Sequence, residues 1–474
     1  MKKFTKIVAT ISDKRCDVDF IRSLAEAGIN VVRMNSAHLD YDGFKMIVEN
    51  TRAADESLGI MMDTKGPEIR TTSTVSGDPI EFHAGDRVEI IGDPEGLTTP
   101  ERICFNYPDI ARDVRPGCRI LIDDGEMAFS VKEINGTIIL TEAENDGRLG
   151  SRKSVNIPGI RIDLPAVTDR DRRNIGYAVE LGVDFIAHSF VRSAADIREV
   201  QDILDSYGAE TKIIAKIENQ EGIDNFKEIL DASYGIMVAR GDLGIEVPAE
   251  KIPGMQAMMI NECISAHKPV IVATQMLHSM IQNPRPTRAE VSDVANAVYQ
   301  RADAMMLSGE TANGKYPVEA VKVMTSVAQE VESSDRNRMN IPPLVDKDIT
   351  SFIAREAVIS EKLLDTKGIF TDAYRGVSAR FIASFRGNNP TYAICHNQNV
   401  QHWLSLSYGV FTFFDHEPTD LIPRHSVKAL HEIVESGRLR PSDRIAYLTG
   451  TKAGARALEF LTPAELFAEE DLSK

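Results

Sequence analysis

Eight short apolar segments alternate with amphipathic helical segments along this chain of 474 residues, and this alternation most constrains the fold. Such a pattern predicts parallel strands that are connected by helices. Eight repeats favour a (β/α)8 TIM barrel, a fold of the α/β class, and a doubly wound sheet is the alternative. The expected strands are residues 6–11, 30–34, 60–63, 184–189, 211–218, 235–242, 269–275 and 303–308.

Polar side chains end almost every one of these segments, and this favours the barrel. Barrel enzymes carry their chemistry at the carboxyl ends of the strands. One polar strand end means little, because any strand that enters a loop tends to end in polar residues. The full set indicates an active-site rim: Ser12, Arg33 with Asn35, Asp63 with Thr64, Ser189, Lys216 with Glu218, Asp242, Thr274 with Gln275, and Ser308 with Glu310.

Two further parts interrupt or follow the alternation. From residue 72 to residue 153 short alternating segments are separated by turns, and Asn135-Gly136 is a strong hairpin signal. This predicts an all-β domain, inserted at the rim between barrel residues 1–71 and 154–338, where it would act as a lid. Residues 339–474 combine helices with apolar strands and predict a C-terminal α/β sandwich domain.

The fifth and sixth segments end in charged residues that indicate metal and phosphate chemistry. Side chains two residues apart share one face of an extended strand, so we expect Lys216 beside Glu218 and Arg240 beside Asp242. Two carboxylates with room for water and substrate oxygens are typical of a Mg²⁺ site. A cation beside them suits an anionic, phosphate-bearing substrate. This spacing leaves the substrate open.

Charge and cysteine content exclude several classes of function. The chain has 54 Lys and Arg residues against 71 Asp and Glu residues, a formal net charge of −17, and no basic cluster. This argues against a nucleic-acid partner, and no apolar run is long enough for a membrane-spanning helix. Five scattered cysteines without a CxxC spacing are typical of reduced thiols. We therefore expect a cytoplasmic protein that holds an anionic substrate with local cations and metal.

Other rim residues have both a functional and a structural interpretation. Arg33 has the fork geometry that clamps phosphate, although such arginines are often salt-bridge partners. Arg70 follows a Gly-Pro turn that can present it to a ligand. The Thr274 hydroxyl can relay a proton or bond to the backbone. For Thr287 we favour a structural role, a helix capping box with Glu290.

Five motifs, in this order, resemble the pyruvate kinase family: DTKGPEIR (63–70), IIAKIEN (213–219), MVARGDLG (237–244), ATQML (273–277) with residues 284–296, and MLSGETA (306–312). The resemblance covers essentially the whole chain, including the inserted and C-terminal domains. It implies transfer of the phosphoryl group of phosphoenolpyruvate to ADP, giving pyruvate and ATP in glycolysis. The alternatives are a Mg²⁺-dependent barrel lyase that handles pyruvate enolate and a catalytically silent regulatory paralogue.

The resemblance also implies roles for residues that bind the metal and phosphoenolpyruvate. Glu218 and Asp242 would bind the catalytic Mg²⁺, and Lys216 would neutralise the transferring phosphoryl group and the enolate. Arg33 would hold the substrate phosphate. The backbone N–H groups of Gly241 and Asp242 would face the substrate carboxylate at a helix start.

The same resemblance assigns the proton transfer and the nucleotide contacts. Thr274 would protonate the enolate, directly or through water, and Ser308 would lie near the same carbon atom. Arg70 and Lys153 match the contacts to the phosphates of ADP and ATP. A second Mg²⁺ would arrive with ADP.

A K⁺ site is implied by Asn35, Asp63 and Thr64. Ala37 stands where the family has a hydroxyl, with Ser36 beside it, and Glu68 resembles the potassium-dependent members. We expect activation by K⁺, and Ala37 leaves its strength open.

The C-terminal domain departs from the family at an effector-binding loop. Residues 373–378 (AYRGVS) keep Gly376 and Ser378 but lack two other hydroxyls, and residues 449–454 resemble the second effector-site loop. Some phosphorylated allosteric effector stays open, and fructose 1,6-bisphosphate is disfavoured. The resemblance implies a homotetramer.

Overall fold

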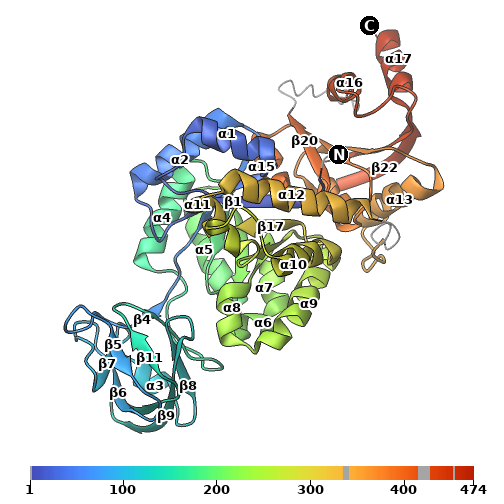
Figure 1. Ribbon diagram of the computed structural model, residues 1–474. Helices are drawn as coiled ribbons and strands as arrows, with labels where there is room; N and C mark the ends of the chain where they lie inside the picture. Colours follow the sequence, from blue (N-terminus) through green and yellow to red (C-terminus); the bar gives the residue numbers. More distant parts are fainter. Residues whose placement is uncertain (1–2, 335–340, 415–426, 452–453, 474) are drawn as a thin grey trace.

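The computed structural model describes residues 3–334, 341–414, 427–451 and 454–473. Its centre is a closed barrel of parallel strands in the order β1-β17-β16-β15-β14-β13-β3-β2 (Figure 1). These strands are β1 (Lys6–Thr10), β2 (Val31–Asn35), β3 (Gly59–Asp63), β13 (Phe185–His188), β14 (Lys212–Ile217), β15 (Gly235–Ala239), β16 (Val270–Ala273) and β17 (Ala304–Leu307). The barrel prediction is confirmed, and closure excludes the doubly wound sheet.

Helices surround the barrel because its strands are apolar on both faces. The longer ones are α1 (Val18–Ala27), α2 (Tyr41–Ala54), α4 (Asp169–Glu180), α5 (Ala194–Ser206), α9 (Ile252–Ser265), α10 (Arg288–Tyr299) and α12 (Pro317–Ser333). Shorter ones are α6 (Gln220–Asp224), α7 (Phe226–Ala232), α8 (Arg240–Glu246), α11 (Gly309–Ala312), η1 (Ala249–Lys251) and η2 (His278–Ile281). The predicted capping box of Thr287 and Glu290 is present at the start of α10.

One strand prediction is wrong where it matters for the site. The segment expected to run to Asp242 ends at Ala239, and α8 begins at Arg240. Arg240 and Asp242 therefore do not share a strand face; two residues apart on a helix, their side chains diverge by about 200°. The backbone turns here into a short helix, which places Asp242 in its first turn.

The inserted domain has two sheets and its own apolar core. The larger sheet has the order β4-β12-β8-β9-β10-β6-β7, and β11 pairs with β5. The Asn135-Gly136 hairpin is confirmed, since β9 and β10 are antiparallel and Asn135 pairs with Ile138. The elements are β4 (Ile69–Arg70), β5 (Ile80–Phe82), β6 (Arg87–Gly92), β7 (Arg102–Phe105), α3 (Ile110–Asp113), β8 (Arg119–Ile122), β9 (Met127–Asn135), β10 (Ile138–Ala143), β11 (Gly147–Leu149) and β12 (Ser154–Asn156).

The C-terminal domain is a five-stranded sheet with helices, in the strand order β20-β19-β18-β21-β22. Its elements are α13 (Ile349–Leu363), β18 (Ile369–Ala373), α14 (Val377–Ser384), β19 (Thr391–Cys395), α15 (Gln398–Trp403), η4 (Leu404–Leu406), β20 (Val410–Phe414), α16 (Val427–Glu435), β21 (Ile445–Thr451), β22 (Gly454–Leu461) and α17 (Pro463–Ser473). The expected boundary at 338/339 and residues 452–453 of the second effector-site loop lie outside the described residues.

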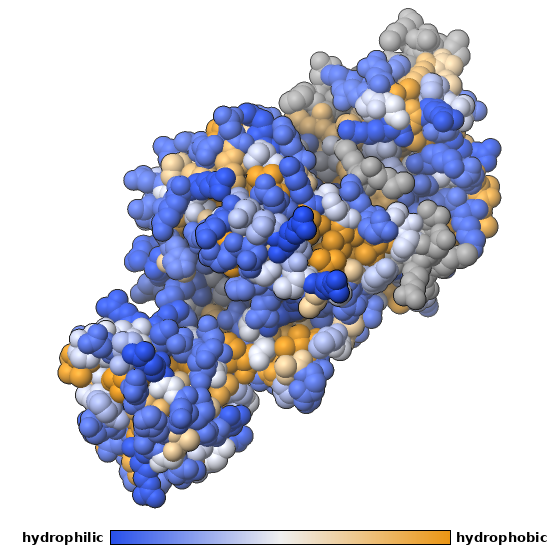
Figure 2. Space-filling view, viewed as in Figure 1, coloured by the Kyte–Doolittle hydropathy of each residue, from blue (hydrophilic) through white to orange (hydrophobic). Residues whose placement is uncertain are grey.

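The two flanking domains lie at opposite ends of the barrel (Figure 1). The C-terminal domain contacts the amino ends of the strands, where Arg386 pairs with Asp303 (2.6 Å) and His402 with Asp184 (2.7 Å). The inserted domain follows the carboxyl end of β3 and leaves the rim on that side. Hydrophilic residues cover most of the face seen in Figure 2. Within the described ranges, no helix is long and apolar enough to cross a membrane.

Candidate active site

Lys216 lies at the centre of a buried ionic cluster at the carboxyl ends of the barrel strands. Its ammonium group donates to Ser189 Oγ (2.7 Å) and contacts Glu218 Oε1 (3.0 Å) and Asp63 Oδ2 (3.2 Å). The Lys216 side chain is 10% exposed and that of Glu218 1%. Lys216 and Glu218 therefore face each other, as the alternation predicts, with Lys216 near the carboxyl end of β14 and Glu218 directly after it.

Arg33 joins the same cluster from the neighbouring side of the barrel. Its Nη1 donates to Thr10 Oγ1 (3.1 Å), and its Nη2 pairs with Asp63 Oδ2. Asp63 thus faces two cations with one oxygen. The other oxygen, Oδ1, is buried and has no hydrogen-bond partner in the structure. A buried carboxylate oxygen without a donor is unusual and is open to a cation.

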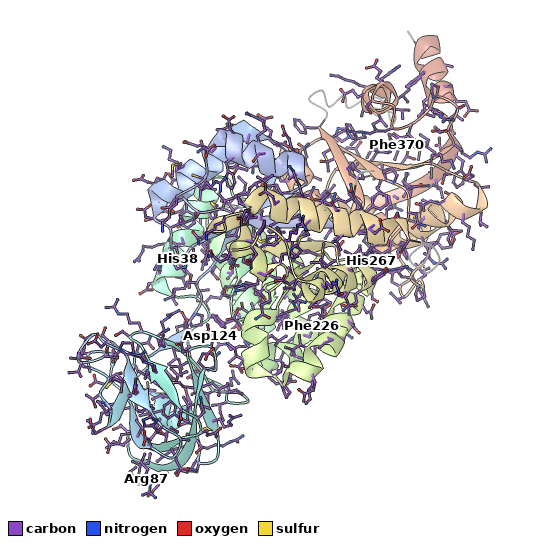
Figure 3. All side chains as sticks on the ribbon, viewed as in Figure 1. His38, Arg87, Asp124, Phe226, His267 and Phe370 are labelled. Atoms are coloured by element: carbon purple, nitrogen blue, oxygen red, sulfur yellow. The ribbon has the colours of Figure 1, made fainter. Side chains whose placement is uncertain are left out.

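Asp242 completes the cluster from the first turn of α8. Burial raises the pKa of Asp242, Lys216 opposes this, and Asp124 of the inserted domain adds to it. Figure 3 shows Asp124 on the side of the inserted domain nearest the barrel. The sequence did not identify Asp124 as a site residue, because only the tertiary structure brings it near Asp242, which is distant in sequence.

The pKa shifts differ among the carboxylates of the cluster. Burial would raise the pKa of Asp63, but Arg33 and Lys216 outweigh it and lower that pKa, whereas the pKa values of Glu218 and Asp242 are raised. Burial raises the pKa of Glu218, Lys216 opposes the rise, and Asp242 and Asp63 increase it. Burial favours neutral Lys216, but Asp63 and Glu218 outweigh it and raise the pKa of the ammonium group. Two cations face three carboxylates here, so an added metal cation would reduce the repulsion.

Thr274 lies in a sharp turn directly after β16. Its Oγ1 accepts from Gly241 N (2.7 Å) and donates to Ala273 O (2.6 Å). A hydroxyl has one proton and two lone pairs, so one acceptor position remains for water or a ligand. Ser308 follows β17 on the same rim, and its N–H donates to Glu310 Oε2 (2.8 Å).

The residues expected at a K⁺ site are neighbours at the ends of β2 and β3. Asn35 pairs with Asp63 across the two strands, and Asn35 Oδ1 accepts from Ala37 N (3.0 Å). Thr64 Oγ1 accepts from Ser189 N (3.0 Å). Ala37 supplies no side-chain oxygen, and these three residues together offer oxygen atoms of the kind that K⁺ prefers.

Arg70 ends β4 and Lys153 directly precedes β12, the adjacent strand at the base of the inserted domain, and both lie apart from the buried cluster. Thr71 N donates to Lys153 O (2.8 Å), which fixes their spacing. Both side chains are partly exposed and form ion pairs, Arg70 with Glu68 (2.6 Å) and Lys153 with Asp123 (2.8 Å). Exposed pairs of this kind exchange readily for a stronger anion such as phosphate.

A cavity of about 140 Å³ lies between the inserted domain and the barrel. Asp242 and Glu246 line it from α8, and Asp124 and Asn156 from the inserted domain. Asn156 Nδ2 donates to Glu246 Oε1 (3.3 Å), which links the two sides. A larger cavity of about 450 Å³ lies beside the C-terminal domain, but no expected site residue lines it. Of the expected site residues, Asp242 lines the smaller cavity.

Comparisons with known proteins identify the family. The model of the pyruvate kinase barrel domain matches residues 2–321, and that of the pyruvate kinase alpha/beta domain matches residues 351–460. The chain belongs to the pyruvate kinase family. A pyruvate kinase of Borreliella burgdorferi is 44% identical over 453 residues, 95% of this chain and 94% of that protein. Human pyruvate kinase PKLR is 40% identical over 476 residues, 95% of this chain and 83% of that protein.

Solved structures agree with this membership. A pyruvate kinase crystal structure from Cryptosporidium parvum superposes with a TM-score of 0.91 and 36% sequence identity, covering 97% of this chain and 96% of that one. As a member of the pyruvate kinase family, the chain is a phosphotransferase of glycolysis. It transfers the phosphoryl group of phosphoenolpyruvate to ADP and gives pyruvate and ATP.

Proposed function

We propose that the cluster around Lys216 is the pyruvate kinase active site, with Glu218 and Asp242 as Mg²⁺ ligands. The observation that carries this proposal is the buried ammonium of Lys216, which lies within 3.2 Å of both Asp63 and Glu218. The Lys216 ammonium at the rim can therefore face the phosphate of a bound substrate. The catalytic power then comes from positioning and charge neutralisation, as phosphoryl transfer requires.

The residues present fit a divalent cation. Glu218 and Asp242 are buried acids whose pKa values are raised, and a dication would stabilise both in their charged forms. Across the described residues, no group of three or more acidic, histidine or cysteine side chains is placed to hold a metal. Mg²⁺ bound here would take most of its ligands from water and substrate, as Mg²⁺ in proteins usually does. When bound, it would draw electron density from the phosphoryl oxygens.

The chain's own cations would position phosphoenolpyruvate. Arg33 is 8% exposed, and its two Nη atoms contact Thr10 and Asp63. Its Nε has no hydrogen-bond partner in the structure and would donate to a phosphate. Lys216 would stabilise the negative charge that develops as the phosphoryl group leaves and the enolate forms. The backbone N–H groups of Gly241 and Asp242 lie in the first turn of α8 and would face the substrate carboxylate, with the Gly241 N–H shared between that carboxylate and Thr274 Oγ1, to which it donates here.

Thr274 is proposed as the proton donor to the enolate, directly or through water, and Ser308 as a second hydroxyl near the same carbon. The Thr274 hydroxyl now donates to Ala273 O, and rotation about its C–O bond would turn that proton toward the substrate. Protonation converts the enolate to the more stable ketone. The phosphoryl transfer therefore becomes effectively downhill.

Activation by K⁺ is proposed at Asn35, Asp63 and Thr64. The partnerless Asp63 Oδ1 supports a cation there, since a monovalent ion would satisfy this oxygen without displacing Arg33 or Lys216 from Oδ2. Ala37 removes one hydroxyl from the donor set. K⁺ would add positive charge near the substrate phosphate.

Arg70 and Lys153 are proposed to bind the phosphates of ADP and ATP, with a second Mg²⁺ arriving with the nucleotide. Their ion pairs with Glu68 and Asp123 hold both cations at the base of the inserted domain until phosphate replaces the carboxylates. The Asn156–Glu246 bond and the effect of the Asp124 charge on Asp242 support closure of this domain on the rim, which would exclude water.

We propose a cytoplasmic homotetramer, in line with the family. Gly376, with φ of 72°, precedes α14, and Ser378 lies in its first turn. Backbone N–H groups at such a start suit a phosphorylated allosteric effector.

Substitution of Lys216 tests the site assignment. Lys216→Met should lower the rate of pyruvate formation by about 10³-fold, because charge stabilisation in the transition state is lost. Lys212→Met is a matched control on the same strand, since Lys212 lies at the opposite end of β14 over the Trp403 ring. It should keep the rate within about twofold. A Lys216→Met chain with an undiminished rate would refute the assignment.

A further inference from the structure

Two consecutive residues of the turn after β16 adopt left-handed backbone conformations. The φ angles are 68° for Thr274 and 55° for Gln275. This region is unfavourable for residues other than glycine, above all for a β-branched residue such as threonine. Such conformations persist only where neighbouring groups hold them. The turn that carries the proposed proton donor therefore depends on a partner.

Arg240 is that partner. Its Nη2 donates to the carbonyl oxygen of Thr274 (2.7 Å) and lies 2.8 Å from Met276 Sδ. Its Nη1 donates to Asp293 Oδ1 of α10 (2.8 Å). The Arg240 side chain is 10% exposed and that of Asp293 is 34% exposed, so both bonds are partly buried. The planar guanidinium fork fixes the two directions at once.

The same helix turn also fixes the direction of the Thr274 hydroxyl. Gly241 directly follows Arg240, and its N–H donates to Thr274 Oγ1. The start of α8 therefore holds Thr274 at two points, its carbonyl through the Arg240 side chain and its hydroxyl through the Gly241 backbone. Loss of the first contact would let the turn relax and move the hydroxyl away from the substrate.

We propose that Arg240 is a positioning residue for protonation of the enolate, acting through the Thr274–Gln275 turn and itself oriented by Asp293. This inference rests on the proposed function of Thr274. In that step C3 of the enolate takes a proton from the Thr274 hydroxyl or from water bound to it. The C2–C3 electron pair forms the new C–H bond, C2–O becomes the ketone, and solvent returns a proton to the donor oxygen. Arg240 contacts no reacting atom.

The experiment separates protonation from phosphoryl transfer. Arg240→Lys and Arg240→Gln are compared with the wild-type chain in two assays. The first measures ATP formation from phosphoenolpyruvate and ADP in a single turnover. The second measures exchange of the C3 hydrogens of pyruvate for solvent deuterium in the presence of ATP, Mg²⁺ and K⁺. By microscopic reversibility, this exchange uses the same proton transfer as the forward reaction.

We expect the ratio of exchange to ATP formation to fall about tenfold or more in Arg240→Gln, because a displacement near 1 Å costs up to about 10²-fold. A lysine at this position can still reach one carbonyl oxygen, so the ratio should fall less in Arg240→Lys. An unchanged ratio in both variants would overturn the inference about Arg240. Failure of the wild-type chain to form pyruvate would instead overturn the proposed function.

Arg52 supplies a matched control. It also donates to one backbone carbonyl, that of Leu58, and to one carboxylate, that of Asp184 (2.7 Å), but it lies at the amino ends of the strands. Arg52→Lys should leave the ratio unchanged. A drop equal to that of Arg240→Lys would show a general loss of structure and would contradict a specific role for Arg240.

Two further variants keep the test decisive if the Arg240 variants do not fold. Asp293→Asn retains Arg240 and weakens the charge that orients it, so the ratio should fall about threefold. A wild-type ratio there would count against the inference. Gln275→Gly relieves one left-handed residue. Added to Asp293→Asn, it should restore part of the lost ratio, and no recovery would contradict the holding role.

Discussion

At the scale of single residues, the main feature of the rim is how its cations compensate the charges of its carboxylates. Asp63 Oδ2 faces both Arg33 and Lys216, and Glu218 Oε1 faces Lys216 as well. Lys216 is therefore shared between two carboxylates, whereas Arg33 pairs only with Asp63 among the described residues. Buried carboxylates without sufficient positive charge have raised pKa values and favour a bound metal ion. The chemistry proposed for the site follows from this imbalance.

Glu218→Gln is the most direct test of the metal assignment. The amide keeps the shape of the side chain but loses the charge, so the Mg²⁺ concentration for half-maximal rate should rise by about tenfold to a hundredfold. The measurement is the initial rate of pyruvate formation over a range of Mg²⁺ concentrations.

Glu228→Gln provides the comparison for that experiment. Glu228 lies in α7, and its Oε1 accepts from Ala194 N (3.0 Å), away from the rim. Its substitution should leave the Mg²⁺ dependence unchanged. A Glu218→Gln chain with the wild-type Mg²⁺ dependence would exclude Glu218 as a ligand.

At the scale of elements, sequence reasoning succeeded where the local signal was complete. The capping box of Thr287 and Glu290 and the Asn135-Gly136 hairpin are both present as predicted. It failed at Arg240, because a polar run after an apolar strand does not reveal whether the chain turns into a helix. It also missed Asp124, because the effect of its charge on Asp242 depends on how the domains pack. Local patterns encode elements, whereas such contacts are set by the tertiary structure.

The β9–β10 hairpin gives a prediction about backbone conformation. Gly136 has φ of 65°, and an added Cβ would meet no atom within 4 Å. Gly136→Ala should therefore lower the free energy of unfolding by about 1 kcal/mol through the backbone alone. Chemical denaturation followed by fluorescence of the inserted domain, labelled at a single site, would measure this.

Gly254→Ala is the control for the hairpin. Gly254 lies in α9, where a Cβ also meets open space but the backbone is helical. Alanine there should leave stability unchanged or raise it by about 0.5 kcal/mol. Equal destabilisation by both substitutions would contradict a conformational cause.

Glu361 of α13 predicts a pH dependence of stability. Burial raises its pKa to about 7, although Asn388 N and Asn389 N donate to it and oppose the shift. The pKa in the folded chain exceeds the unfolded value of about 4.3, so its stabilising contribution is complete below pH 4.3 and is lost as pH rises through 7. The free energy of unfolding of Glu361→Gln, relative to that of the wild-type chain, should therefore rise by about 2 kcal/mol between pH 5 and pH 8.

Denaturant unfolding of both chains at the two pH values measures that difference. The comparison removes contributions from other titrating groups, because they are common to both chains. A difference in stability that does not change with pH would show that Glu361 titrates normally.

At the scale of the whole molecule, the barrel separates the inserted domain from the C-terminal domain. The inserted domain follows the carboxyl ends of the strands, where the rim residues gather, and the C-terminal domain contacts the amino ends (Figure 1). Asp303 and Asp184 precede β17 and β13, the strands that lead to Ser308 and Ser189. Contacts of the C-terminal domain therefore bear on strands that reach the active site.

The Arg386–Asp303 pair should contribute strongly to this attachment. Both side chains are less than 5% exposed, and Arg386 also donates to Ala383 O (2.8 Å). Arg386→Met would leave Asp303 buried without its cation and should lower the free energy of unfolding by about 3 kcal/mol. Asp303→Asn added to it should recover part of this loss. Denaturant unfolding measures both, and a single variant as stable as wild type would contradict this account.

The most direct test of the central claim is a lactate-dehydrogenase-coupled assay of the purified chain with phosphoenolpyruvate, ADP and Mg²⁺, with and without K⁺. Pyruvate formation is followed by NADH oxidation. We predict pyruvate formation that requires Mg²⁺ and is faster with K⁺. No pyruvate formation with or without K⁺ would contradict the account.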